Sequence, residues 1–141
     1  MAGTQLGGIV TAQRMSVACT AAQVETADGV LATMEVPTDA VILDVRLTVT
    51  DMDSSTGLLI DVGDAAGPAT PDDDRFIAAF TGQAAGSIAA AGEGNLLADS
   101  EYAYTAASSS RTVQEIEATV NTVATTGVAG TLTLTAIYFR P

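Results

Sequence analysis

Histidine, lysine and tryptophan are absent from this sequence, and cysteine occurs once, at Cys19. Without histidine the chain cannot build a histidine-based catalytic triad or a histidine-ligated metal site. A single cysteine cannot form a disulfide within the chain, and it cannot supply a cysteine-rich zinc site. These absences exclude most familiar forms of catalysis, so the residues alone do not point to a reaction.

Aromatic residues are scarce, at 4% of the chain, although hydrophobic residues reach 48%. The apolar content is therefore mainly Ala, Val, Leu and Ile, which predicts a thin aliphatic core. A chain of 141 residues and 14.2 kDa has the size of one domain. At that mass a folded monomer buries roughly two-thirds of the surface that its unfolded chain exposes, so it can form a stable core.

Basic residues are also scarce, because five arginines stand against seventeen acidic residues and the net charge is −12 at pH 7. The five are Arg14, Arg46, Arg75, Arg111 and Arg140. Phosphate backbones and anionic membrane surfaces repel such a chain, so we expect no nucleic-acid partner and no membrane partner. Three origins of this composition stay open: a halophilic host, a GC-rich genome that favours arginine codons, and docking on a more basic partner.

Long apolar runs are missing as well. No stretch approaches the 18 or so apolar residues of a membrane span, and the first eight residues lack the basic start and apolar run of a signal peptide. We therefore expect synthesis in a cytoplasm, and a lone cysteine agrees with a reducing compartment.

Residues 1–22 are predicted to form an N-terminal arm. Gly3, Gly7 and Gly8 interrupt the segment, and it has few large apolar residues before Met15. Glycine-rich termini are ordered only when a partner holds them. Two interpretations stay open, a disordered tail and an arm that becomes ordered on a neighbouring subunit.

Alternation of apolar and polar residues predicts strands from residue 30 onward. Residues 30–36 form one run, which Pro37 ends, and residues 41–50 form the clearest one. In that second run one face is apolar and the opposite face carries Asp44, Arg46, Thr48 and Thr50. The predicted apolar face consists of Leu43, Val45, Leu47 and Val49.

The middle of the chain is predicted to hold short strands between loops. A turn at 51–57 precedes a strand at 58–62, which Gly63 and Asp64 close, and residues 65–74 are predicted to form a surface loop. Short strands are then expected at 75–80, near 87–91 within a long loop at 81–98, and at Tyr102 and Tyr104.

Residues 112–124 fit both a helix capped by Ser110 and a strand, and their content of Thr and Val favours the strand. The following turn at 125–130 and the alternating run at 131–139 then predict a β-hairpin. Seven or eight short strands separated by turns predict an all-β fold, an antiparallel β-sandwich, jelly roll or small barrel. We expect it to occupy residues 23–141 as one domain.

Asp51, Asp53, Ser55 and Gly57 place oxygen ligands at alternate positions, as at the start of a calcium-binding loop. The glycine comes one place late, however, and position 62, where an acidic residue is needed, is Val62. The favoured alternative is a turn in which these side chains bind their own backbone. We therefore assign no metal site here.

Three further groups of residues are weaker candidates for functional sites. The first is an acidic group, whose paired carboxylates could act as acid and base, as in glycosidases. For this group we favour a solvated acidic loop with Arg75 as counter-charge. Cys19 lacks a base and is expected to be a small buried hydrophobe. The glycines at 86, 92 and 94 lack the context of a phosphate-binding loop. The acidic group consists of Asp61, Asp64, Asp72, Asp73 and Asp74. No catalytic residue, cofactor or metal is predicted.

Three short motifs resemble those of small structural proteins of tailed-virus particles. They are Val-Pro-Thr-Asp-Ala-Val-Ile at 36–42, Asp-Val-Gly-Asp at 61–64 with Pro-Asp-Asp-Asp-Arg-Phe-Ile at 71–77, and Gly-Thr-Leu-Thr-Leu at 130–134. The family phrase after the gap is Pro-Asp-Arg, which extra Asp residues lengthen here. The resemblance extends over about residues 30–139 and carries no binding residues across.

This resemblance implies a β-sandwich and a non-enzymatic virion protein that decorates and stabilises a capsid lattice. It implies the major capsid protein as partner, a homo-oligomer with a trimer favoured, and a location on the capsid surface after assembly in the host cytoplasm. The arm at 1–22 would bridge capsid subunits. Two alternatives stay open, a tail, neck or head-fibre component of the virion and a carbohydrate-binding β-sandwich module.

Overall fold

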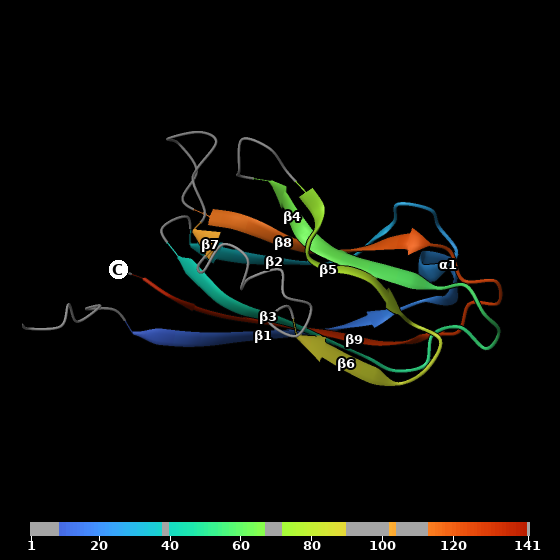
Figure 1. The fold of residues 1–141 in the computed structure, drawn as a ribbon. Coiled ribbons are helices and arrows are strands. Elements are labelled where there is room, and N and C mark those ends of the chain that lie inside the picture. The colour runs from blue at the N-terminus through green and yellow to red at the C-terminus, as the bar shows by residue number, and fades with distance from the viewer. Residues whose placement is uncertain (1–8, 38–39, 67–71, 90–101, 104–112, 141) are drawn as a thin grey trace, which may run out of the picture.

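The structure, a computed structural model, describes residues 9–37, 40–66, 72–89, 102–103 and 113–140 (Figure 1). These residues are mostly in strands, and the one helix among them is α1 (Ala21–Val24). No helix in this part of the chain is long and apolar enough to cross a membrane. The strands are β1 (Val10–Cys19), β2 (Val30–Pro37), β3 (Val41–Val49), β4 (Leu59–Ala66), β5 (Asp72–Thr81), β6 (Gly86–Ala89), β7 (Tyr102–Ala103), β8 (Val113–Thr122) and β9 (Gly130–Phe139).

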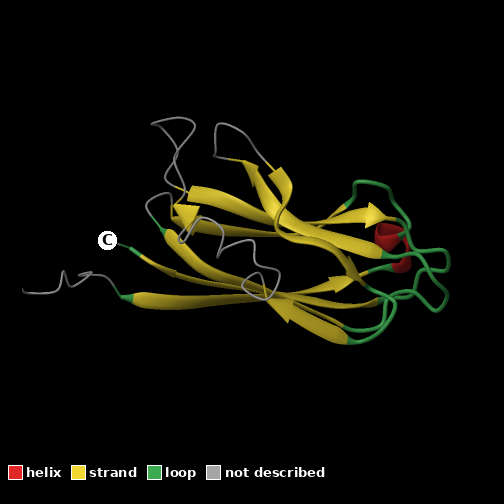
Figure 2. Cartoon of the chain, viewed as in Figure 1, coloured by secondary structure: helices red, strands yellow, loops and turns green. Residues whose placement is uncertain are grey.

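Two antiparallel sheets form two layers (Figures 1 and 2). Sheet A has the strand order β1-β9-β3-β6, with β7 also paired to β3, and sheet B has the order β2-β8-β4-β5. Among the described strands, only β4–β5 and β6–β7 are consecutive in the chain and also lie in one sheet. The chain therefore crosses repeatedly between the layers, and the prediction of an antiparallel all-β sandwich is confirmed.

The core is formed by buried aliphatic side chains of both sheets, because period-two alternation turns every second residue of a strand inward. On β9 the buried apolar side chains include Leu132, Leu134 and Ala136, and on β8 they are Ile116, Ala118 and Val120. The strand interpretation of residues 112–124 is thereby confirmed. Phe76 of β5 is the largest fully buried side chain.

The N-terminal segment differs from the prediction of an arm at 1–22. Val10–Cys19 is strand β1, which pairs with β9 from Val10↔Phe139 to Cys19↔Gly130. Met15 and Val17 pack against the core and Cys19 belongs to it, so this strand is part of the sandwich. Helix α1 follows it, and a capping box between Thr20 and Gln23 begins the helix. Residues 1–8 lie outside the described part of the chain.

Strand β3 contains an irregularity that reverses part of its predicted pattern. The register against β9 shifts between Ile42 and Asp44, which is the signature of a β-bulge. After the shift Val45, Leu47 and Val49 are buried as predicted. Before it the parity changes, so Ile42 is 1% exposed and Leu43, predicted to face the core, is 37% exposed.

The predicted hairpin between residues 112–124 and 131–139 is wrong. Strand β8 pairs with β2 and β4 in sheet B, whereas β9 pairs with β1 and β3 in sheet A. The segment at 123–129 therefore connects two sheets rather than two neighbouring strands. Backbone hydrogen bonds from Ala124 N–H to the Val24 carbonyl and from Val128 N–H to the Met52 carbonyl hold this connection away from a tight turn.

Strands β4 and β5 extend farther into the predicted loop at 65–74 than the sequence indicated. β4 continues past Gly63 and Asp64 to Ala66, and β5 already begins at Asp72. The two strands pair with two register shifts. Gly63 permits their close approach, because a Cβ there would lie 2.0 Å from the carbonyl oxygen of Asp72.

Candidate functional site

The segment Asp51–Gly57 forms local turns, as the favoured alternative to a calcium loop predicted. A carboxylate oxygen of Asp51 accepts the backbone N–H of Asp53 at 3.2 Å. Oδ1 of Asp53 in turn accepts the N–H of Ser55 at 3.1 Å. Bonds from a carboxylate to the N–H two residues on define Asx turns. The backbone itself thus occupies oxygens that a cation would need.

Asp53 does more than close a turn, because its carboxylate joins two loops. It is 1% exposed, and it also accepts the N–H groups of Leu58 at 3.1 Å, Thr125 at 3.3 Å and Thr126 at 3.1 Å. Burial by itself would raise the pKa of Asp53, but the four backbone N–H donors outweigh it and hold the pKa below its ordinary 3.8. Asp53 is a buried structural anion that fixes the connection between β8 and β9.

Asp61, from the predicted acidic group, also serves the backbone. It is 4% exposed and lies on β4. One of its oxygens accepts the N–H of Ala79 at 2.6 Å and the other accepts the side-chain amide of Asn121 at 2.7 Å. Ala79 has a positive φ of 53°. The carboxylate therefore fastens an irregular point of β5 onto β4 and β8.

Asp64 forms a buried ion pair with Arg75, which confirms Arg75 as the local counter-charge. The Asp64 side chain is 0% exposed and accepts both the Nε–H of Arg75 and the backbone N–H of Asp72, the latter at 2.7 Å. Nη2 of Arg75 also lies 4.0 Å from a carboxylate oxygen of Asp72. The prediction of a solvated loop is wrong for Asp61 and Asp64, because both are buried within the sheet.

The remaining members of the group lie together at the start of β5. Asp72, Asp73 and Asp74 each offer a carboxylate oxygen, and these oxygens lie within 4.8 Å of one another. The pKa of Asp74 is raised above 3.8, first because its protonated carboxyl group can donate a hydrogen bond to the Asp72 carboxylate, then by slight burial, and then by the negative charges of Asp72, Asp61 and Asp73. These three aspartates could hold a hard cation or a proton, either of which would reduce their mutual repulsion.

The other candidates have structural roles or lie outside the described residues. Cys19 is buried, and this burial raises the pKa of its thiol, so it is a core residue and a poor nucleophile. Gly86 begins strand β6. Gly92 and Gly94 lie outside the described residues.

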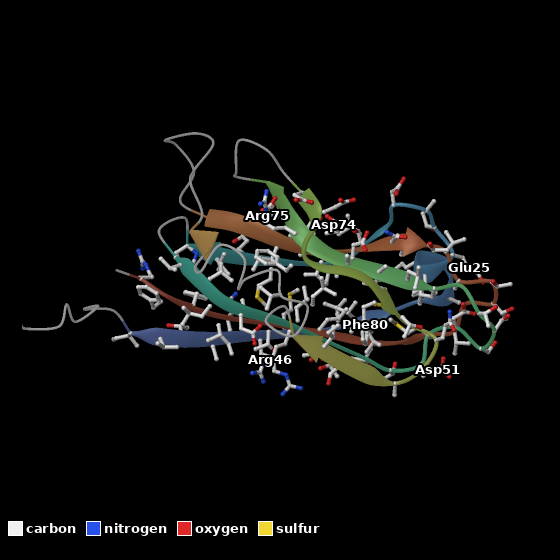
Figure 3. All side chains as sticks on the ribbon, in the orientation of Figure 1. Glu25, Arg46, Asp51, Asp74, Arg75 and Phe80 are labelled. Atoms are coloured by element: carbon white, nitrogen blue, oxygen red, sulfur yellow. The ribbon has the colours of Figure 1, made fainter. Side chains whose placement is uncertain are left out.

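Sequence reasoning missed one property that the sheet topology creates, which is the separation of charge between the layers. Among the described residues, the strands of sheet B carry eight acidic residues and one arginine, Arg75. The eight are Glu35, Asp61, Asp64, Asp72, Asp73, Asp74, Glu115 and Glu117. The described strands of sheet A carry one acidic residue, Asp44, and two arginines, Arg14 and Arg46. Figure 3 shows Asp74 and Arg75 on one layer and Arg46 on the opposite layer.

The outer face of each sheet reflects this difference. In sheet B, Glu35 lies directly opposite Glu115, a pairing of like charges that costs stability. In sheet A, Arg14, Thr135 and Arg46 form one row across three strands. The next row is Ser16, Thr133 and Thr48, in which the hydroxyls of Ser16 and Thr133 are 2.8 Å apart. Among the described residues, the outer face of sheet A is thus rich in hydroxyl groups and nearly free of acidic residues.

Comparison with known proteins identifies the fold. No family model and no curated protein sequence matches the chain. A chain of the cyanophage Pam1 capsid asymmetric unit is similar, with a TM-score of 0.65 and 21% identity over 100% of this chain and 91% of that chain. A chain of the capsid of Ralstonia phage GP4 is similar, with a TM-score of 0.63 and 23% identity over 100% of this chain and 91% of that one. The sandwich therefore has a fold that occurs in chains of two phage capsids.

Proposed function

We propose that this chain is a non-enzymatic structural protein of a phage virion, which decorates and stabilises the capsid lattice through protein–protein contacts. One observation carries the proposal: the fold matches chains of two phage capsid structures across the whole of this chain. The virion-protein motifs in the sequence agree with this match. The proposed location is the capsid surface, reached after assembly in the host cytoplasm.

The roles of the buried carboxylates support a structural function rather than catalysis. Asp53, Asp61 and Asp64 are all engaged, by backbone N–H groups, by the Asn121 amide or by Arg75. A general acid or base needs a carboxyl group that can reach a substrate proton. The carboxylates of these three residues are instead engaged in hydrogen bonds and an ion pair that hold loops and strands together.

The proposed partner is the major capsid protein, and the proposed assembly state is a homo-oligomer, with a trimer favoured. A specific interface buries about 800 Å² per partner. On a symmetric lattice a trimer can make the same contact three times, and such multivalency raises the overall affinity without strong single contacts. The net charge of −12 disfavours nucleic acid and anionic membrane as partners.

Co-sedimentation tests the proposal. The purified chain is mixed with empty shells assembled from the major capsid protein of the same genome, and the mixture is separated on a density gradient. We expect saturable binding to shells and a higher melting temperature of the loaded shells. If the chain does not bind the shells and instead binds purified tails or necks, the capsid assignment is overturned.

Light scattering coupled to size exclusion tests the assembly state. A trimer has three times the 14.2 kDa mass of one chain. Lattice symmetry can drive trimer formation. The same measurement is therefore also made on protein that is mildly cross-linked while bound to saturated shells and is then released by dissociating the shells. Cross-linked dimers without trimers would contradict the three-fold arrangement.

A further inference from the structure

Strand β1 forms an outer edge of sheet A that is unusually long and regular. Of the described strands, only β9 pairs with it. The ten residue pairs between them run from Val10↔Phe139 to Cys19↔Gly130 without a register shift. The unpaired side of an edge strand presents alternating N–H and C=O groups, which can pair with a further strand.

The other three edges described in the structure carry features that prevent such pairing. Strand β2 has a register shift between Val30 and Ala32 and ends at Pro37. Strand β5 has two register shifts and begins with three consecutive aspartates, and the edge beyond β3 consists of β6 and β7, which have four and two residues. Bulges, proline, charge and short length are the usual protections of an edge strand. Strand β1 has neither proline nor bulge.

The side chains of β1 also suit an added strand. Met15 and Val17 pack against the core yet stay partly exposed, so the core is incompletely covered along this edge. On the opposite side of the strand, Ser16 and Ala18 are exposed and small, and Arg14 carries the only charge of β1. A strand beside β1 could therefore bury apolar area on one side without desolvating an acid.

We propose that the outer edge of β1 accepts an extended segment of the capsid partner as an additional strand of sheet A. This inference rests on the proposed function and specifies its contact. The segment that fits has apolar side chains at alternate positions, which cover Met15 and Val17, and a neutral or acidic side chain beside Arg14. Main-chain hydrogen bonds supply affinity in this mode of recognition, and the alternate side chains supply specificity.

A second copy of this chain fits the edge less well than a different protein. The other described edges are protected, so two copies could pair only through β1 against β1. That arrangement closes at two subunits, so it cannot produce the trimer proposed above. An extended segment of a different protein meets no such limit.

Two lysine substitutions in β1 test the proposal with the same change in charge. Val17→Lys places an ammonium group on the partly exposed inner side, where it stays solvated in the free protein but is covered by an added strand. Ala18→Lys places it on the exposed outer side of the same strand and serves as the control. Burying an unpaired charge weakens binding strongly, so we expect Val17→Lys to lower shell affinity by roughly 100-fold or more and Ala18→Lys by less than roughly threefold.

Hydrogen exchange on the unmodified protein provides a measurement that does not depend on folding of a variant. We expect alternate amides of residues 10–19 to gain protection when the chain is bound to shells, because an added strand pairs every second N–H. Binding of wild type with equal binding of Val17→Lys, or protection confined to other strands, would overturn the β1 contact while leaving the proposed function intact. A failure of wild type to bind shells counts against the proposed function itself. Self-association that Val17→Lys abolishes would overturn the choice of partner.

Discussion

Replacing Asp64 with alanine is expected to destabilise the protein by about 3–4 kcal/mol. Its side chain is 0% exposed, and it accepts hydrogen bonds from the Asp72 backbone N–H and from Arg75. A hydrogen bond to a charged group contributes about 1.5–3 kcal/mol. Two such bonds set an upper range of about 3–6 kcal/mol, and the 27% exposure of Arg75 lets water recover part of its solvation. We therefore expect a loss near the lower end of this range, about 3–4 kcal/mol.

Thermal and urea unfolding, followed by circular dichroism, measure this effect. A chain of 141 residues has an unfolding entropy of about 0.3 kcal/mol per kelvin, so the melting temperature should fall by about 10–13 °C. Asp73→Ala is the matched control, because Asp73 belongs to the same aspartate cluster but is exposed. A loss for Asp64→Ala below about 1 kcal/mol, or equal to that of Asp73→Ala, would refute the role of Asp64 as a buried anchor.

Three further substitutions probe the irregular parts of the sandwich. Asp53→Asn should lower the melting temperature more than Asp51→Asn, because an amide NH₂ at position 53 would face several backbone N–H donors, whereas Asp51 accepts a single backbone N–H among the described residues, that of Asp53. Equal losses in calorimetry would contradict this. Asp74→Asn should raise stability at pH 7 and flatten its pH dependence in urea titrations. The sign follows because the raised pKa of Asp74 makes the folded state bind more protons than the unfolded state, so stability falls as pH rises from about 3.8 through the raised value. Ala79→Gly should stabilise by about 0.5–1 kcal/mol, since glycine removes the cost of a positive φ, while Ala78→Gly should destabilise by a similar amount; unfolding curves in which both change in the same direction would disprove this.

Alternation predicted the strands well where it was uninterrupted. The runs at 30–36, 41–50 and 131–139 correspond to β2, β3 and β9, and the strand near 87–91 corresponds to β6. Alternation could not reveal a bulge, because a single extra residue leaves the composition of the run unchanged. Ile42 and Leu43 are both apolar, so only the register against β9 decides which of them is buried.

The partners of the strands were harder to predict than the strands themselves. A short polar connection at 125–130 looks the same whether it joins neighbours in one sheet or crosses between two. What distinguishes the cases is a contact far away in sequence, the bond between the Asp53 carboxylate and the N–H of Thr126, 73 residues apart. The N-terminal segment was misjudged for a similar reason, since its ten-residue pairing with β9 joins the two ends of the chain.

The amino-acid sequence by itself determined the class of the protein, because an acidic, histidine-free, aliphatic chain with a period-two pattern favours an all-β fold. Tertiary structure alone decided which acids became buried anchors and which stayed in an exposed cluster. It also decided that acidic residues gather on sheet B while sheet A, with its unprotected β1 edge, stays nearly free of them. The physical reason is that alternation is a local property of the chain, whereas burial, charge separation and free edges depend on which distant strands become neighbours.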